Sequence, residues 1–305
     1  MPPERQPITA PAAPRRDSTP PGRRPRAVVF AHFDPDGGFD PYVVEALRRY
    51  RPHADRLVVV SASAERLPAT LRGAVDTFVP RDNVGYDFGS WRAGLETLRP
   101  EDYAEILCVN DSVYGPLDDL GQALDHPRTA DADLWGMVLS EQSTRRRGGR
   151  CPHVQTWFFG MRRRLLESPV YAAFWGSVAA VPTKEDVVDR YELGLSDACR
   201  RAGLRIAGIY DAREAGPARL AELWPHLALA EIRRSWRLVK KSRRTPHNPS
   251  ELVWWRLLEA GVPFVKVGLF RVNHYGLDLG RVCRDLALRH PAAMPLIRDH
   301  LARCG

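Results

Sequence analysis

Short apolar runs alternate along the chain with segments of helical periodicity. The run 27–32 (AVVFAH) is apolar and rich in β-branched residues, which is typical of a buried parallel strand. From Pro41 onward, apolar residues such as Val43 and Leu47 recur on one helical face. A second apolar run follows at 57–60. The beginning of the chain therefore predicts a β-α-β unit.

The same alternation continues towards the C-terminus. Further strands are predicted at 77–80, 106–109, 134–139, 153–161, 204–210 and 264–272, and further helices at 91–98, 185–202 and 249–260. This order predicts an α/β fold with a mainly parallel, Rossmann-like sheet that is flanked by helices. We expect one such domain at 27–230, and a C-terminal helical and strand extension at 231–305 that packs on the same domain.

Length and composition narrow the class of protein. The 305 residues can bury a sizeable core, and no run of about 18 apolar residues suggests a membrane span. Residues 1–26 carry eight prolines and six arginines against two acidic residues, which predicts a disordered tail. Because this tail lacks the apolar segment of a signal peptide, we expect a cytoplasmic protein. The five cysteines are scattered and odd in number, and are expected to be reduced thiols.

The formal net charge of +8 is concentrated, because the tail alone contributes six positive and two negative charges. A second basic run at 233–244 is expected to form a helix face or a connector. We interpret the tail as a solvated extension without a specific partner. The alternative for these basic segments is a peripheral contact with the inner face of a membrane. A further alternative is nucleic-acid binding, but we expect no nucleic-acid partner.

Polar residues gather after the third predicted strand, in the loop 81–89. In open α/β sheets, ligands bind beyond the carboxyl ends of the strands. Arg81 suits a phosphate, Asn83 and Asp87 suit a nucleobase or sugar hydroxyls, and Gly85 permits close backbone approach. The alternative is a structural turn that is closed by an ion pair between Arg81 and Asp87. The sequence favours a donor-binding loop.

The fourth predicted strand runs directly into Asn110, Asp111 and Ser112. At this edge of the sheet, the Asp111 carboxylate is a candidate ligand for a divalent cation, Mg2+ or Mn2+, held against a diphosphate. All three residues are candidates for donor binding. The alternative is an Asn-Asp turn that caps the next segment.

Two literal D-x-D strings compete for the metal role. The string at 131–133 precedes its strand, which is the wrong end of a parallel strand for a ligand. The string at 34–36 follows the first strand, so Asp34 and Asp36 stay candidates for contact with the nucleotide.

Three further candidates come from the second half of the chain. Glu192 lies beside the apolar stripe of a predicted helix, so burial is expected to raise its pKa towards that of a general base. The alternative is an ordinary surface glutamate. His153 and Gln155 lie in an apolar, aromatic run and are candidates for acceptor binding if they face the same cleft; otherwise they are core polar groups. No P-loop, G-x-S-x-G or H-E-x-x-H motif is present.

These motifs resemble the rhamnan synthesis protein F family of bacterial polysaccharide glycosyltransferases. The resemblance covers about 27–280 and is carried by two long motifs, N-x-G-Y-D-F-G-S-W and N-D-S-x-Y-G-P. The matching segments are VVFAHFDPDG from 28, RDNVGYDFGSWRAGL from 81, ILCVNDSVYGPL from 106, DLWGM from 133, HVQTWFF from 153, FW from 174, YELGLS from 191 and NPSELVWWRLLEAGVPFVKVGL from 248.

The resemblance implies a GT-A-like fold and inverting transfer of a sugar, such as rhamnose, from a nucleotide-diphosphate sugar to a glycan or lipid-linked glycan in polysaccharide synthesis. It implies that Asp111 meets metal and diphosphate, and that Glu192 is the catalytic base. The motif at 110–112 has one carboxylate where metal-binding members of the fold have two. Arg81 or the arginines at 145–150 are therefore the alternative to a metal for neutralising the charge of the diphosphate. The alternative function is a non-catalytic glycan- or nucleotide-sugar-binding protein.

Overall fold

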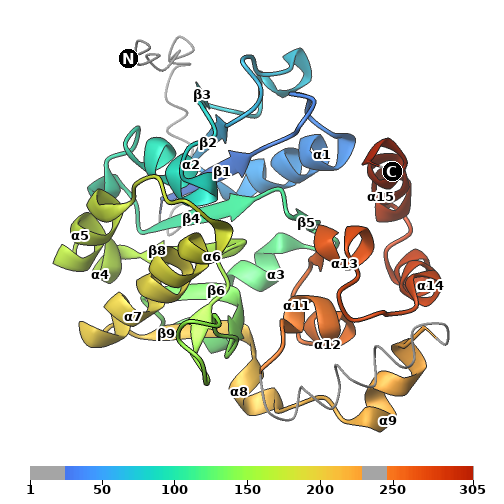
Figure 1. The fold of residues 1–305 in the computed structure, drawn as a ribbon. Coiled ribbons are helices and arrows are strands. Elements are labelled where there is room, and N and C mark those ends of the chain that lie inside the picture. The colour runs from blue at the N-terminus through green and yellow to red at the C-terminus, as the bar shows by residue number, and fades with distance from the viewer. Residues whose placement is uncertain (1–24, 229–245, 305) are drawn as a thin grey trace.

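The computed structural model describes residues 25–228 and 246–304. Its centre is an eight-stranded sheet with the order β3-β2-β1-β4-β8-β6-β7, in which β9 also pairs with β6. Helices cover both faces of this sheet (Figure 1). The predicted α/β fold with a mainly parallel sheet is confirmed. The predicted disordered tail, except for its last two residues, the basic run at 233–244 and the boundary between 230 and 231 lie outside the described residues.

The first half of the sheet is parallel. Its strands are β1 (Arg26–His32), β2 (Arg56–Ser61), β3 (Thr77–Pro80) and β4 (Glu105–Asn110). They pair in parallel as β3 with β2, β2 with β1, and β1 with β4. Helix α1 (Pro41–Tyr50) connects β1 to β2, and α2 (Tyr86–Leu95) connects β3 to β4. The four strands and α1 agree with the sequence prediction.

The second half of the sheet is mixed. Its strands are β6 (Leu134–Ser140), β7 (His153–Val154), β8 (Phe158–Arg162) and β9 (Ile206–Asp211), and a separate two-stranded sheet joins β5 (Val113–Tyr114) to β10 (Val265–Lys266). Strand β8 lies antiparallel between β4 and β6, so β6 runs in the direction of β4. Strand β9 is parallel to β6. The carboxyl ends of β1, β4, β6 and β9 therefore meet at one edge.

The remaining elements are mostly short helices. They are α3 (Leu120–Leu124), α4 (Arg163–Leu166), α5 (Pro169–Ser177), α6 (Lys184–Val187), a π-helical turn (Val188–Glu192), α7 (Leu193–Arg201), α8 (Ala212–Ala215), α9 (Leu220–Leu223), α11 (Pro249–Leu252), α12 (Trp254–Glu259), α13 (Val267–Arg271), α14 (Leu279–Arg289) and α15 (Ala293–Cys304). Short 3-10 turns lie at Arg51–His53, Ala69–Leu71, Pro100–Asp102, Pro127–Thr129 and Trp224–His226.

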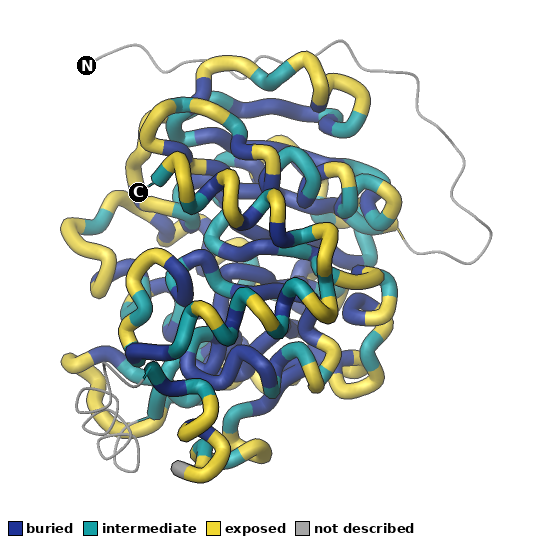
Figure 2. The backbone as a smooth tube through the Cα atoms, turned by 90° about the vertical axis from the view of Figure 1, so that its right-hand side faces the viewer, coloured by how far each residue is buried: buried dark blue, intermediate teal, exposed yellow. Residues whose placement is uncertain are grey.

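The sheet separates two apolar layers, as expected from the alternation of side chains along a strand. In β1, Val28 and Phe30 pack into the layer beneath α1 and the C-terminal helices. Val29 and Ala31 face the opposite layer, which α2, α5 and α7 cover. Figure 2 shows buried segments in the interior of the molecule and exposed turns on its surface. No helix in the described ranges is long and apolar enough to cross a membrane.

Three of the predicted elements are interrupted or end early in the structure. The strand predicted at 153–161 is broken at 155–157, where polar side chains form buried hydrogen bonds. The helix predicted at 249–260 is interrupted at Val253. The strand predicted at 264–272 is wrong beyond Lys266, because its partner β5 has only two residues and the chain turns into α13.

The C-terminal helices α14 and α15 were not predicted. Val282 and Leu286 of α14 and Ile297 of α15 are buried in the same layer as α1. Helix α15 lies beside α1 (Figure 1). The C-terminal part of the chain thus covers one face of the sheet, close to the end of β1.

Candidate functional site

The loop after β3 is shaped by glycine. Gly85 has a left-handed backbone with φ of 80°, and the next residue, Tyr86, also has a positive φ of 54°. A Cβ on Gly89 would lie 2.3 Å from the carbonyl oxygen of Val84. The chain can therefore turn sharply into α2 at Tyr86, five residues before the predicted helix start. This places Asp87 in the first turn of α2.

Arg81 holds this loop from inside. Its guanidinium donates hydrogen bonds to the Val84 carbonyl and, over 3.0 Å, to the Ser90 hydroxyl. Partial burial lowers the pKa of Arg81 below its usual value. The alternative ion pair between Arg81 and Asp87 is absent from the part of the chain that the structure describes. Asn83 lies exposed at the tip of the loop.

The two sequence motifs meet through side-chain hydrogen bonds. Asn110 Nδ2 donates to Asp87 Oδ2 over 2.9 Å. Asn110 Oδ1 accepts from the Ser112 hydroxyl over 2.7 Å and from the Ser112 backbone N–H over 3.1 Å. Burial raises the pKa of Asp87, an effect that the Asn110 hydrogen bond opposes. Asp87, Asn110 and Ser112 therefore form one polar cluster at the carboxyl edge of the sheet.

Asp111 lies beside this cluster and is also tied to the end of β1. Its Oδ2 accepts a hydrogen bond of 2.6 Å from the Phe33 backbone N–H, and its carbonyl accepts one of 2.8 Å from the Tyr42 hydroxyl. Burial, followed by the charge of Asp87, raises the pKa of Asp111 to about 8. Asp87 is hydrogen-bonded to Asn110, the residue before Asp111, and its charge contributes to the raised pKa of Asp111. The site therefore has a second carboxylate besides Asp111, and this carboxylate, Asp87, comes from the N-x-G-Y-D-F-G-S-W motif.

Asp34 is held by the C-terminal helix. Arg303 on α15 contacts Asp34, Asp36 at 2.5 Å and Asp40 at 2.6 Å. Asp34 also accepts a hydrogen bond from the Asp36 backbone N–H. The predicted donor contact of Asp34 stays a prediction, while the structure gives its carboxylate an internal partner. No local sequence pattern pointed to Arg303, because 269 positions separate it from Asp34.

Glu192 ends the π-helical turn, a feature that is frequent at functional sites. Its Oε2 accepts a hydrogen bond of 2.7 Å from Thr156, and its Oε1 lies 3.2 Å from His153 Nε2. Burial alone would raise the pKa of Glu192, but the His153 and Thr156 hydrogen bonds and the charges of His153 and Lys266 lower it. The expectation of a raised pKa is therefore wrong in direction. The base role of Glu192 stays a prediction.

The two predicted acceptor residues are buried and have partners. His153 Nδ1 donates to the Cys151 carbonyl over 2.7 Å, so both ring nitrogens face oxygen atoms. Gln155 donates to Asn248 Oδ1 over 2.9 Å and accepts from Trp157 Nε1 over 3.0 Å and from the Ser250 hydroxyl. His153 therefore supports Glu192, and Gln155 ties the sheet to the start of α11. Direct acceptor binding by either residue stays a prediction.

Lys266 is a residue of this site that the sequence analysis missed. Its Nζ donates to the Ser112 hydroxyl over 3.0 Å and lies 5.6 Å from the centre of the Trp157 ring. Burial lowers the pKa of Lys266, while the charges of Glu192, Glu251 and Asp87 act in the opposite direction. A lone lysine inside the apolar run PFVKVGL was the available signal.

Three of the arginines at 145–150 are paired with carboxylates that do not belong to this cluster. The ion pairs of this loop are Arg146 with Asp186, Arg147 with Asp189 and Asp197, and Arg150 with Glu141. Three of its arginines are therefore engaged by carboxylates of neighbouring segments.

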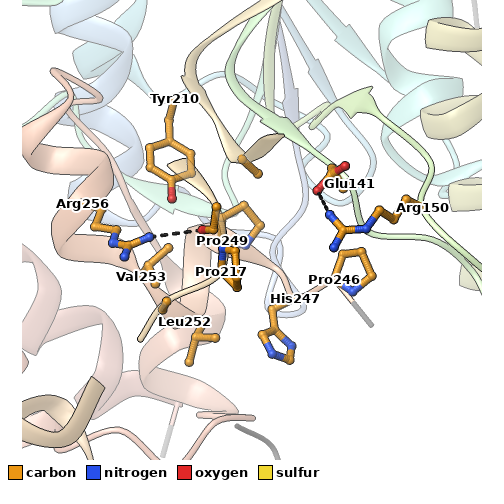
Figure 3. Close-up of a pocket in the computed structure, with 13 residues that line it drawn as sticks. Glu141, Arg150, Tyr210, Pro217, Pro246, His247, Pro249, Leu252, Val253 and Arg256 are labelled. Carbon is orange, nitrogen blue, oxygen red and sulfur yellow. Dashed lines mark hydrogen bonds and ion pairs between the residues drawn. The ribbon is translucent and has the colours of Figure 1, made fainter. Parts of the chain in front are cut away.

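Two hollows of the described surface lie elsewhere. One encloses about 70 Å³ beyond the ends of β6 and β9, where the pair of Glu141 and Arg150 lies across from Tyr210 and Arg256 (Figure 3). The other, of about 580 Å³, lies at the amino edge of the sheet beside Glu105. Neither is lined by Asp87, Asp111 or Glu192. The polar cluster is recognised by its chemistry and by its place at the sheet edge.

Comparison with known proteins places this cluster in a family context. The model of the family described as "Rhamnan synthesis protein F" matches residues 57–229. "Virulence protein VirA" of Vibrio anguillarum is 25% identical over 226 residues, which cover 72% of this chain and 70% of VirA. "Uncharacterized protein y4gN" of Sinorhizobium fredii is 24% identical over 134 residues, which cover 43% of this chain and 34% of y4gN. The family match includes both motifs.

Similar solved structures include two proteins of low sequence identity to this chain. Mannosyltransferase PcManGT from Pyrobaculum calidifontis, in complex with GDP-Man and Mn2+, has a TM-score of 0.36 and 14% identity, over 98% of this chain and 78% of its own. S. aureus TarS 1-349 has a TM-score of 0.36 and 12% identity, over 60% of this chain and 57% of its own. These likenesses are weak, and the family match is the stronger finding.

Proposed function

The chain belongs to the rhamnan synthesis protein F family of nucleotide-sugar-dependent glycosyltransferases, and on this premise we propose that it moves a sugar from a nucleotide-diphosphate sugar to a glycan acceptor with inversion. The family description suggests rhamnose as the sugar. The observation that carries the proposal is the hydrogen bond between Asn110 and Asp87, which makes one site of two motifs.

The donor binds, in this proposal, where the loop 81–86 and the end of β4 meet. Asp87, Asn110 and Ser112 supply hydrogen-bonding groups, and exposed Asn83 and the glycine backbone at Gly85 supply the adjoining surface. Arg81 acts indirectly, because its guanidinium holds the loop through Val84 and Ser90.

A divalent cation fits this site if it is shared with the diphosphate. In the described ranges, no group of three or more His, Cys, Asp and Glu side chains could hold a metal by itself. Asp87 is hydrogen-bonded to the residue before Asp111, and its charge disfavours ionisation of Asp111. One or two carboxylates plus substrate phosphates are the usual ligands of Mg2+. Asp87 and Asp111 would hold the ion, which when bound would neutralise charge on the diphosphate.

Glu192 is the proposed base. Its lowered pKa keeps the carboxylate ionised at neutral pH, and His153 and Thr156 fix its orientation. The acceptor hydroxyl passes its proton to Glu192 as the acceptor oxygen bonds to the anomeric carbon. The bond from that carbon to the diphosphate oxygen breaks, and its electron pair leaves with the nucleoside diphosphate.

The proposed acceptor is a growing polysaccharide or a lipid-linked glycan in the cytoplasm. The basic run at 233–244 would suit a peripheral contact with an anionic membrane surface. This part of the proposal rests on sequence and on the family, since the run lies outside the described residues.

The proposal is tested by product formation. Purified protein is incubated with UDP-, GDP- and dTDP-sugars, with Mg2+ or Mn2+, and with free or lipid-linked oligosaccharides, and the acceptors are analysed by mass spectrometry. Addition of one sugar residue from one donor series is expected. Tight donor binding without product under every metal condition would instead support a non-catalytic binding protein.

A further inference from the structure

The C-terminal part of the chain delivers Lys266 directly to the end of β4. Strand β10 pairs antiparallel with β5, so Lys266 lies opposite Val113 and Val265 opposite Tyr114. The Val267 backbone N–H donates to the Ser112 carbonyl over 3.0 Å, which extends this pairing towards Asp111. Backbone hydrogen bonds therefore fix Lys266 beside the second motif.

The side chain of Lys266 is the first donor in a chain of hydrogen bonds. Lys266 Nζ donates to the Ser112 hydroxyl, which donates to Asn110, whose amide donates to Asp87. Each hydrogen bond in this chain joins a group that can donate to a group that can accept. The chain sets the ammonium and the Asp87 carboxylate at opposite ends of one short row of side chains.

The charges of Glu192, Glu251 and Asp87 act on the Lys266 ammonium, but none of these carboxylates pairs with it directly. The ammonium makes no ion pair with a carboxylate in 25–228 or 246–304, and its recorded close partners are the Ser112 hydroxyl and the Trp157 ring. A partly buried ammonium is unfavourable unless it is paired and hydrogen-bonded. Lysine has three N–H donors, so at least one remains for an anion.

Other cations near the motifs are less suited to a ligand. Arg81 is bonded within its own loop, and Arg146 and Arg147 are paired with carboxylates. Lys184 is exposed at the start of α6, although its charge acts on Asp87. Lys266 is the cation that the described fold both orients and leaves without an ionic partner.

We propose that Lys266 binds the diphosphate of the donor and stabilises the negative charge that develops there as the bond to the sugar breaks. This inference rests on the proposed function. The electron pair of the breaking bond goes to the diphosphate oxygen, and the ammonium keeps its proton throughout. Electrostatic stabilisation of this kind acts most strongly where charge develops.

The test measures nucleotide binding by calorimetry. Wild type and Lys266→Gln are titrated with UDP, GDP and dTDP and with the corresponding nucleosides, with and without Mn2+. Loss of one charge-assisted hydrogen bond predicts about 10- to 100-fold weaker binding of the preferred nucleoside diphosphate by Lys266→Gln, with nucleoside binding unchanged. Equal diphosphate affinity of wild type and Lys266→Gln would overturn the role of Lys266.

Two further variants keep the test decisive. Arg271→Gln removes an exposed positive charge from α13, close in sequence, and is expected to bind the diphosphate as wild type does. Lys266→Arg keeps the charge, so it is expected to fold and to retain most of the affinity for the diphosphate even if Lys266→Gln unfolds. If a folded Lys266→Arg lost about 10- to 100-fold in diphosphate affinity, as is expected of a neutral side chain, the proposal would be contradicted. Wild type that binds no nucleoside diphosphate would overturn the proposed function itself.

Discussion

The amide of Asn110 donates a 2.9 Å hydrogen bond to the carboxylate of Asp87, across 23 positions of sequence. Asn110 ends a central strand, and Asp87 lies in the first turn of α2. The same amide group accepts from Ser112, so Asn110 uses both ends of its side chain. Through this contact, the two motifs of this chain form one hydrogen-bonded unit.

Replacement of Asn110 by Asp is expected to destabilise the protein. The substitution keeps the shape of the side chain but removes the donor to Asp87 and brings a like charge against it. We expect the free energy of unfolding to fall by about 1–3 kcal/mol, measured by urea denaturation at neutral pH. The matched control is Asn83→Asp at an exposed position, which is expected to leave stability unchanged. Equal stability of Asn110→Asp and wild type would contradict this account of the contact.

Asp111 is expected to make stability depend on pH. Its folded-state pKa is raised to about 8, so between the unfolded value of about 4 and this value the folded protein holds a proton that the unfolded chain has released. The free energy of unfolding should therefore fall as pH rises through this window. Without divalent cations, Asp111→Asn is expected to show a shallower fall, by about 1 kcal/mol per pH unit. If the free energy of unfolding of wild type and of Asp111→Asn depended on pH in the same way, the pKa of Asp111 would not be raised.

Glu192→Gln is expected to remove turnover and to spare donor binding. Loss of a general base should lower kcat by about 10²- to 10⁴-fold, while the Kd for the nucleoside diphosphate changes little. Because the pKa of Glu192 is lowered, wild-type activity should not fall on the acid side through protonation of this group until the pH is below the usual carboxyl range. The control is Glu185→Gln, exposed on α6. A kcat for Glu192→Gln close to that of wild type would remove Glu192 from the mechanism.

Arg303→Gln is expected to loosen the loop after β1. Asp34 and Asp40 are 4% and 7% exposed, and both lose their cation in this variant. Since Arg303 is itself partly exposed, we expect a loss of roughly 2 kcal/mol of unfolding free energy rather than that of a fully buried pair. Thermal and urea unfolding measure this loss, and exposed Arg298 on the same helix, replaced by Gln, is the control. If Arg303→Gln and Arg298→Gln lost the same unfolding free energy, the contacts of Arg303 with Asp34 and Asp40 would not stabilise the loop after β1.

Gly89→Ala is expected to disrupt the loop 81–86 and weaken donor binding. Its Cβ would meet the Val84 carbonyl at 2.3 Å and the Arg81 guanidinium at 2.9 Å, so the loop must shift. We expect a loss of about 2 kcal/mol in stability, together with weaker binding of nucleoside diphosphate. Gly73→Ala, where a Cβ would have no neighbour within 4 Å, is the control. Unchanged binding by a folded Gly89→Ala would argue against this loop as a donor surface.

The strands at 27–32, 57–60, 77–80 and 106–109 could be predicted because each is a short apolar run that lies buried in a parallel sheet. Local pattern failed where tertiary contacts decide the backbone. The start of α2 depends on the left-handed Gly85, and the break after β7 depends on Gln155, which reaches Asn248 in a distant segment.

The part of the candidate site that the two sequence motifs form could be predicted from the sequence. Asp87, Asn110, Asp111 and Ser112 follow strands that end at the same edge of the sheet. Lys266 was not predictable, because the pairing of β10 with β5 is set by a contact between residues about 150 positions apart rather than by local periodicity. The pKa of Glu192 was also beyond sequence reasoning, since His153 and Thr156 become its partners only in the fold.

Release of nucleoside diphosphate by purified protein is the measurement that bears most directly on glycosyl transfer at this site. Wild type and Asp111→Asn are compared with UDP-, GDP- and dTDP-sugars in the presence of acceptor and Mn2+. We expect acceptor-dependent release from one donor series by wild type, and release at least about 100-fold slower by Asp111→Asn. Equal rates for the two proteins, or no release from any donor by wild type, would contradict sugar transfer at the site formed by Asp87, Asn110 and Asp111.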